Sequence, residues 1–260
     1  MDATTQGASP SNGRRWGSRV LIGLPALFLL VDAVGKLAKA APVIEATTGL
    51  GYPESMVRPL GAILLASTIV YLIPRTAALG AILLTGYLGG AVATHVRAES
   101  GWFPILFPVF MGVLLWGGLY LQDRRLQALL PLRTVLPAAS TKLRWAGRIL
   151  TALPTLLLLF SAVMKLVQPP PVVEGLAKFG YPAYIPLPLG IVELACTVLY
   201  LIPQTAVLGA ILLTGYLGGA TATHARISDP FLMTILVGIA VWGGLYLREE
   251  RLRALLPLRT

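Results

Sequence analysis

Four ionisable side chains lie inside long apolar segments of this chain, where a charge without a partner is costly. Asp32 and Lys36 are four residues apart in the first apolar segment, so one helical turn brings them together. Lys165 and Glu193 lie in two successive segments of the second half. Inserting a charged residue at the centre of a membrane helix costs about 2.5 to 3.5 kcal/mol. Two interpretations stay open: a neutral ion pair that fixes the helices, or a site that binds a ligand or exchanges a proton.

Two histidines, His95 and His224, occupy equivalent positions in two Thr-His-x-Arg motifs that also contain Arg97 and Arg226. An imidazole can pass protons, hydrogen-bond to a quinone carbonyl, or ligate haem. Haem ligation from both sides requires the two histidines to face each other across the bundle, so a quinone is the preferred cofactor interpretation. A purely structural hydrogen bond is the remaining alternative.

Several other kinds of site are missing from the sequence. The single cysteine, Cys196, lies in an apolar run and rules out disulfide scaffolding, a thiol relay and a cysteine zinc site. The sequence has no Cys-x-x-Cys-His motif, no nucleotide-binding glycine loop and no His/carboxylate cluster at metal spacing, so we expect no metal centre. Whether the protein is an enzyme stays open, and no catalytic residue is assigned.

The composition identifies the environment in which these groups work. Of the 260 residues, 56% are hydrophobic and 12% are charged, whereas a soluble domain has roughly 25% charged residues. The mean hydropathy is +0.76, and several apolar stretches approach the length that crosses a bilayer, which predicts a multi-span helical membrane protein. The net charge of +10 comes from basic residues at the ends of apolar segments. It therefore indicates membrane topology and lipid contact, and we expect no nucleic-acid partner.

The chain is a tandem duplication. Residues 71–97 align without gaps with residues 200–226, and only four of these 27 positions differ. Each copy has four apolar segments, which predicts eight spans at residues 19–36, 56–73, 77–96, 103–121, 150–167, 184–202, 206–225 and 230–247. Because four is an even number, both copies enter the membrane from the same side. We therefore predict an all-α integral membrane protein whose eight transmembrane helices form two parallel-repeat four-helix bundles.

This organisation predicts the domain boundaries and the orientation. We expect a disordered cytoplasmic N-terminus at residues 1–18, the first repeat at 19–133, a basic cytoplasmic linker at 134–147 and the second repeat at 148–260. Fourteen basic residues fall on the side of both termini against seven on the other, which predicts cytoplasmic termini in the plasma (inner) membrane. A cleaved signal peptide is the alternative for the first segment. The matching segment, residues 150–165, argues against it because it lies in mid-chain.

Small residues predict where helices pack closely. Gly86 with Gly90, and Gly215 with Gly219, form GxxxG spacings in the third segment of each copy, which favours an interhelical packing face. Between the first two segments of the second copy, apolar residues at helical spacing predict a short interfacial helix on the outer side. The first copy has a weaker version of the same pattern.

The two copies distribute their acidic groups differently. The second copy has Ser161 where the first has Asp32, and it has Glu193 where the first has Leu64. Each copy therefore keeps one embedded acid with one lysine. Counting the helical rise along both segments places Glu193 at about the depth of Ser161. We therefore predict that Lys165 pairs with Glu193.

The second copy also combines these residues in a recognisable order along the chain. The set comprises Lys165, Glu174, Gly180-Tyr181-Pro182, Glu193, Tyr200-Leu-Ile-Pro203, the glycine-rich third segment, and Thr223-His224-x-Arg226 followed by Asp229-Pro230. It resembles the DoxX-like family of four-helix membrane proteins over about residues 19–122 and 148–247. The first copy departs from the family pattern at Leu64 and at Glu99-Ser100-Gly101. Since the wider DoxX group is associated with quinone-linked sulfur oxidation and with membrane complexes that respond to oxidative stress, the resemblance implies a redox or quinone-binding role.

The leading hypothesis is an outer-side polar cavity in each repeat that binds a quinone or a small apolar molecule, in a subunit of a membrane redox complex. The candidate ligand or proton site consists of Lys165, Glu193, His224 and Arg226, with Lys36, Asp32, His95 and Arg97 as its diverged counterpart. The expected partners are the lipid bilayer and redox partner proteins. The alternatives are a proton-coupled small-molecule transporter that uses a cavity between the repeats, and a non-catalytic membrane scaffold.

Overall fold

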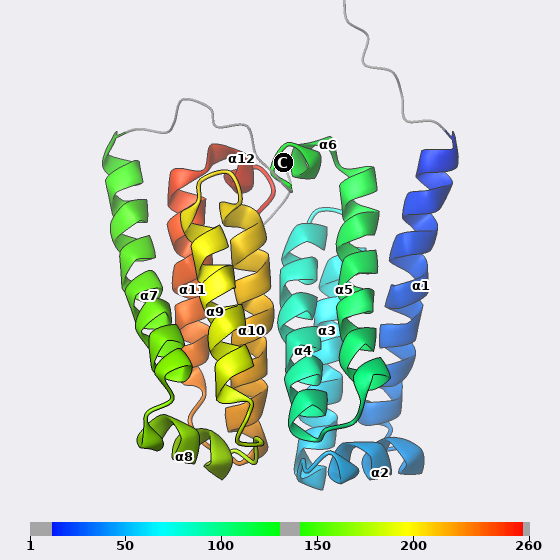
Figure 1. The fold of residues 1–260 in the computed structure, drawn as a ribbon. Coiled ribbons are helices and arrows are strands. Elements are labelled where there is room, and N and C mark those ends of the chain that lie inside the picture. Colours follow the sequence, from blue (N-terminus) through cyan, green and yellow to red (C-terminus); the bar gives the residue numbers. More distant parts are fainter. Residues whose placement is uncertain (1–11, 131–140, 257–260) are drawn as a thin grey trace, which may run out of the picture.

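The computed structural model describes residues 12–130 and 141–256, and all regular structure in these ranges is helical (Figure 1). Two four-helix units stand side by side. The first contains α1 (Asn12–Leu37), α3 (Val57–Leu72), α4 (Ala77–Arg97) and α5 (Trp102–Gln122). The second contains α7 (Thr141–Val167), α9 (Pro186–Leu201), α10 (Ala206–Arg226) and α11 (Leu232–Arg248). In each unit the first and third of these helices both pack against the second and fourth, which closes a four-helix bundle.

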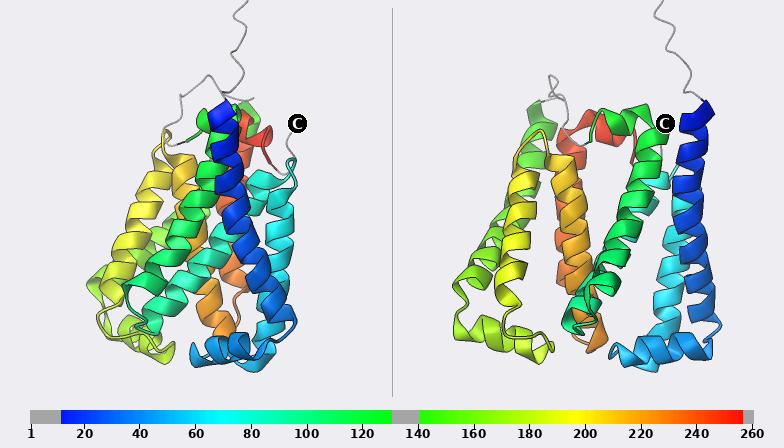
Figure 2. Two further views of the ribbon diagram at one scale, coloured as in Figure 1. Left: turned by 90° about the vertical axis from the view of Figure 1, so that its right-hand side faces the viewer. Right: turned by 45° about the vertical axis from the view of Figure 1, so that its right-hand side comes forward.

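Short helices cover the two ends of the units. At one end, α2 (Ala41–Gly49) and α8 (Pro170–Lys178) lie across the bundles, and the 3-10 helix η1 (Glu54–Met56) follows α2 (Figure 1). We refer to this as the α2/α8 end. At the opposite end lie α6 (Arg124–Gln127) and α12 (Glu250–Arg253), together with the start of α1 (Figure 2). The repeated order of long and short helices follows the sequence duplication.

Six helical segments in the described ranges are long and apolar enough to cross a membrane. They are Trp16–Leu37, Glu54–Leu72, Ala77–Arg97, Trp102–Gln122, Trp145–Val167 and Ala206–Arg226. The remaining two of the eight predicted spans are the shorter apolar helices α9 and α11, with 16 and 17 residues. The outward faces are apolar; Leu153 and Phe160 of α7, for example, are exposed to about two thirds of their area. Such faces suit lipid contact, and the chain is a multi-pass membrane protein.

Two predicted irregular segments are partly helical. Residues 12–18 of the predicted disordered N-terminus belong to α1, and residues 1–11 lie outside the described residues. Likewise, residues 141–147 of the predicted linker belong to α7, and residues 134–140 lie outside the described residues. The helices continue past their apolar segments because no proline interrupts residues 12–18 or 141–147, and polar or basic residues are tolerated in a helix. Hydropathy marks where a span ends, not where its helix ends.

The two units meet along α4 and α10, which run side by side at the centre of the molecule (Figure 1). A β carbon added at Gly89 would overlap the backbone of Gly215, and one added at Gly218 would overlap the backbone of Gly86. The two contacts are equivalent under the repeat, so the units are related by a pseudo-twofold axis that passes between α4 and α10. Glycine is required here because only a residue without a side chain lets two helix backbones approach so closely.

Equivalent hydrogen bonds hold the helices together inside each unit. The Tyr71 hydroxyl donates to the Leu115 carbonyl at 2.9 Å, and the Tyr200 hydroxyl donates to the Val241 carbonyl at 2.8 Å. Both tyrosines are almost completely buried. These bonds tie the second long helix of each unit to the fourth, and they satisfy a buried donor that would otherwise have no partner.

Candidate functional site

A cavity of about 850 Å³ lies in the second unit and extends to the first. Its walls come from α7, α8, α9, α10 and α11 of the second unit and from α4 and α5 of the first. Most of the lining side chains are aliphatic or aromatic. The polar ones include Ser161, Lys165, Glu193, Tyr216 and His224. An apolar pocket with a few convergent polar groups is the usual form of a small-molecule site, and pockets of this kind measure about 300 to 1,000 Å³.

Part of the cavity wall is exposed on the apolar surface of the protein. Val113 of α5 and Val192 of α9 line the cavity, yet 63% and 50% of their respective areas are exposed. Since α5 belongs to the first unit and α9 to the second, this part of the wall includes residues from both units.

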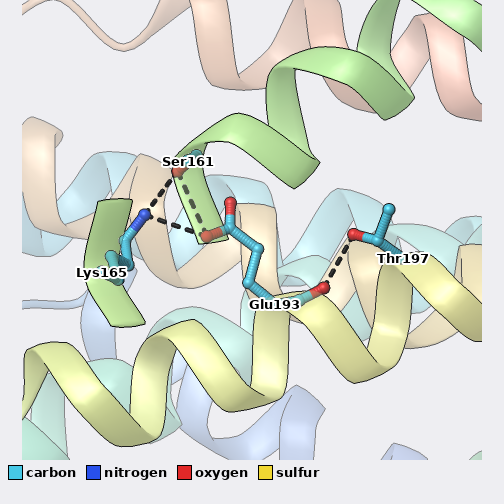
Figure 3. A network of polar contacts seen from close by, with 4 residues as sticks. All are labelled: Ser161, Lys165, Glu193 and Thr197. Atoms are coloured by element: carbon cyan, nitrogen blue, oxygen red, sulfur yellow. Dashed lines mark hydrogen bonds and ion pairs between the residues drawn. The ribbon is translucent and has the colours of Figure 1, made fainter. Parts of the chain in front are cut away.

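The predicted pair of Lys165 and Glu193 is present in this wall (Figure 3). Lys165 Nζ lies 3.0 Å from Glu193 Oε2 and donates to Ser161 Oγ at 2.5 Å. The Ser161 hydroxyl in turn donates to the same Glu193 oxygen at 3.2 Å. Ser161 and Lys165 are one turn apart on α7, and Glu193 reaches them from α9. The serine therefore links the two charged groups in addition to their direct contact.

The acid of this pair is more deeply buried than the base. Glu193 is 2% exposed, whereas the Lys165 side chain is 17% exposed. Lys165 Nζ also lies 6.0 Å from the centre of the Tyr216 ring, a cation–π geometry that adds to its stabilisation. A buried carboxylate that contacts a lysine and a hydroxyl can accept a proton or orient a donor. Lys165 and Glu193 both line the cavity.

His224 lines the same cavity and is held by an acid close to it in sequence. Its Nδ1 lies 2.6 Å from Asp229 Oδ2, and its ring packs edge-on to Phe179, with 4.8 Å between ring centres. This contact fixes the ring orientation and leaves the other ring nitrogen for a ligand. The Asp-Pro ending that the sequence shows only in the second copy thus has a structural role.

The first repeat places its equivalent residues differently. Lys36 pairs with Asp32 on the same helix, and Leu64, which replaces the glutamate, is fully buried. His95 is absent from the cavity wall, and its buried Nδ1 has no hydrogen-bond partner in the part of the chain that the structure describes. The two histidines therefore have different surroundings.

Glu99 follows His95 by four residues but turns toward the second repeat. It accepts a hydrogen bond of 2.9 Å from the Tyr184 hydroxyl. This bond to a carboxylate raises the pKa of the Tyr184 phenol above its ordinary value. Glu99, the acid nearest to His95 in sequence on this side, thus bonds to a residue of the second unit and not to His95.

Arg226 and Arg97 are absent from the cavity wall, although their motifs group them with the histidines. Arg226 Nη2 donates to the Phe179 carbonyl at 2.6 Å, and Arg97 Nη2 donates to the Leu50 carbonyl. These carbonyls belong to the turns that follow α8 and α2. The arginines therefore form a second polar group at the α2/α8 end. The packing glycines Gly86, Gly90, Gly215 and Gly219 lie at the contact between α4 and α10.

Sequence reasoning missed further residues of the cavity wall, among them Tyr216 and Trp116. Tyr216 carries a hydroxyl within an apolar segment, a signal that could have marked it. Trp116 enters from the first repeat and donates to Thr85 at 2.9 Å, and only the packing of the two units shows that it reaches this cavity. Within the described residues, no group of three or more His, Cys, Asp or Glu side chains is placed to hold a metal ion.

Comparison with known proteins agrees with this architecture. The family model described as the DoxX-like family matches residues 20–118 and again residues 149–244, so one match falls on each unit. Searches of curated proteins and of solved structures gave no match. The two matched ranges cover most of the chain, and the protein belongs to the DoxX-like family of membrane proteins, with two tandem units in one chain.

Proposed function

We propose that the second unit binds a quinone, or an apolar molecule of similar size, in the cavity beside Lys165 and Glu193. The observation that carries the proposal is a cavity of about 850 Å³ whose wall is apolar except for a small polar group. The isoprenoid or alkyl part of a quinone would contact the aliphatic wall. Its carbonyl oxygens would meet the polar group.

The residues of the polar group would have distinct roles toward such a ligand. Lys165 would donate a hydrogen bond to a carbonyl oxygen, and Glu193 would hold the lysine in place and exchange a proton with the ligand. His224, oriented by Asp229, would donate to or accept from the second oxygen. In a membrane redox complex a partner protein would supply the electrons, and this chain would bind and position the quinone.

Replacing Glu193 with Gln tests the proposal. Gln keeps the size of the side chain but removes the negative charge, so Lys165 loses the group that positions it. Quinone binding should then weaken by about tenfold or more, the loss expected for a hydrogen bond to a charged group. The measurement is a titration with decylubiquinone, followed by quenching of tryptophan fluorescence, since Trp116 lines the cavity.

Glu45→Gln is the matched control, because Glu45 lies on α2 and outside the cavity wall. It should bind decylubiquinone as the wild type does. The Glu45→Gln variant should unfold at about the wild-type temperature. Glu193→Gln should unfold at a lower temperature because the buried Lys165 loses its charged partner, so binding is measured at a temperature at which circular dichroism shows that both variants are folded. A wild-type protein that does not bind the quinone, or equal affinities for the wild type and Glu193→Gln, would contradict the proposal.

A proton-coupled transporter is the second candidate, and the shared wall of the cavity favours it. Because α4 and α5 contribute to a cavity of the second unit, a movement of one unit against the other would change access to it. We expect such a protein to carry protons into proteoliposomes when a small lipophilic cation is supplied on one side of the membrane. A pH-sensitive dye inside the vesicles measures this flux, and no flux above that of empty vesicles argues for the binding subunit.

We further propose that α9 and α11 also cross the membrane, which makes eight spans with both termini cytoplasmic in the plasma (inner) membrane. Both helices pack inside the same bundles as the longer spans. A helix of 16 or 17 residues is about 25 Å long, slightly less than the hydrocarbon thickness, and the bilayer can thin locally to match it. We also propose the domain division at residues 19–133 and 148–260, with residues 12–18 and 141–147 as helical extensions of α1 and α7.

A further inference from the structure

Two arginines meet at the α2/α8 end of the contact between the units. Arg97 is the last residue of α4, and Arg226 is the last residue of α10. The position of a β carbon at Gly51 would lie 3.3 Å from Arg97 Nη2 and 3.6 Å from Arg226 Nη1. At Gly180 the corresponding distances are 3.8 Å to Arg97 Nη1 and 3.8 Å to Arg226 Nη2. Each guanidinium therefore lies beside the turns of both repeats.

The two turns leave room for the guanidinium groups because a glycine lies in each turn. Gly51 and Gly180 have φ values of +79° and +78°, in the left-handed region where a side chain is disfavoured. Each glycine follows the C-cap of a short helix, and the backbone N–H groups of the turn bond back to that helix. The C-cap carbonyls of Leu50 and Phe179 remain and accept from the arginines. The turns thus position the guanidinium groups from two sides.

The positive charge of the pair is not neutralised within the described residues. Neither Arg97 nor Arg226 forms an ion pair there with a carboxylate. The two nearest acids in sequence are engaged elsewhere, Glu99 by Tyr184 and Asp229 by His224. Two cations side by side repel each other unless an anion lies between or beside them.

Within residues 12–130 and 141–256, the donors of the pair are also largely unused. A guanidinium has five N–H donors, and each of these two bonds to one backbone carbonyl. Arg226 Nε is buried without a hydrogen-bond partner. Both arginines are half-buried, so their remaining donors combine partial desolvation with access from outside. A role limited to holding the two turns would need only one donor from each arginine.

We propose that Arg97 and Arg226 together bind a phosphate-type oxyanion at the pseudo-twofold axis. Planar guanidinium groups pair with two oxygens of a phosphate, and two such groups side by side match its tetrahedral arrangement. The anion could be a lipid phosphate, since the site lies at one end of the membrane-spanning helices, or a free phosphate. The site adjoins the quinone cavity at Phe179, which lines that cavity and accepts from Arg226, and it goes beyond the function proposed for the cavity.

Replacing both arginines with Gln tests the site, first with inorganic phosphate as the probe. The unfolding temperature of the wild type in detergent should rise with added phosphate, but not with chloride at the same ionic strength. The affinity derived from this shift should fall about tenfold or more for each arginine replaced, because each contributes hydrogen bonds between charged groups.

A second arm uses nanodiscs that contain phosphatidylglycerol and phosphatidylcholine, with native mass spectrometry of the lipids that stay bound. Preferential retention of phosphatidylglycerol by the wild type, lost in the double variant, would identify a lipid headgroup as the ligand. A response to inorganic phosphate without lipid retention would identify a free anion. Either outcome supports the site.

Lys178→Gln is the matched control, because it removes an exposed charge from α8 at the same end. It should bind phosphate and lipid as the wild type does. The double Arg97→Lys, Arg226→Lys variant keeps both positive charges. It should bind phosphate more weakly than the wild type does, because a lysine cannot form the paired hydrogen bonds of a guanidinium. If the Gln, Lys and control variants all match the wild type in both arms, the arginines only hold the turns and the proposal is overturned.

Discussion

Replacing Glu193 with leucine is expected to destabilise the protein by about 3 to 5 kcal/mol, the usual cost of removing one partner of a buried ion pair. Glu193 is 2% exposed, and its carboxylate is the only acidic group within ion-pair distance of Lys165 among the described residues. Without it, the lysine charge would remain inside the bundle with only the Ser161 hydroxyl and the Tyr216 ring beside it. Equilibrium unfolding in mixed detergent micelles measures this difference.

The first repeat supplies a matched control for this experiment. Its leucine at the equivalent position, Leu64, is tolerated because Asp32 pairs with Lys36 on the same helix. The double variant Ser161→Asp, Glu193→Leu recreates that arrangement around Lys165. It should recover most of the lost stability. Wild-type stability in the single variant, or no recovery in the double variant, would show that the ion pair does not stabilise the second unit.

The second large effect is expected at Gly89, where α4 touches α10. A Gly89→Ala β carbon would overlap the backbone of Gly215, so the two helices must separate. We expect the free energy of unfolding to fall by about 1 to 3 kcal/mol, the range for overpacking a well-packed contact, even though alanine is a better helix former than glycine. Gly218→Ala should behave alike, because its β carbon would overlap the backbone of Gly86.

Gly117→Ala is the control for these two variants. Gly117 lies in α5 and has no heavy atom within 4 Å of its β-carbon position. The same chemical change there should leave stability unchanged or raise it by up to about 1 kcal/mol. The packing explanation fails if Gly89→Ala and Gly117→Ala unfold at the same temperature.

Much of the helical arrangement could be predicted from local sequence features. Apolar segments of near-membrane length gave the long helices, and the proline-led amphipathic segment gave α8. The pairing of Lys165 with Glu193 was also predictable, because helical rise relates position in sequence to depth. Depth alone sufficed there, since a lysine side chain is long enough to reach a neighbouring helix.

The direction of side chains around a helix was harder to predict. His224 and Arg226 are two residues apart, and two residues turn an α-helix by about 200°. Their side chains therefore point to nearly opposite sides, which explains why His224 lines the cavity and Arg226 binds the turn after α8. A short motif suggests a shared site, although its residues need not share a face.

Contacts between the units could not be derived from either copy alone. The GxxxG spacing pointed to Gly86 and Gly215, and both meet the partner helix, but they do so opposite Gly218 and Gly89, which lie outside the spacing. Which glycine meets the partner depends on how the two helices are rotated and shifted, and the sequence does not encode this locally. The contribution of α4 and α5 to the cavity depends on the same packing.

The most direct test of the account is a native mass spectrum of the protein after gentle solubilisation from its own membrane. We propose that the cavity of the second unit holds a quinone or a similar apolar molecule beside Lys165 and Glu193. We predict a bound mass of that class on the wild-type protein and its loss from Glu193→Gln. A wild-type protein that carries no such mass, or only bulk lipid that Glu193→Gln retains equally, would contradict the account and favour a transporter or a scaffold.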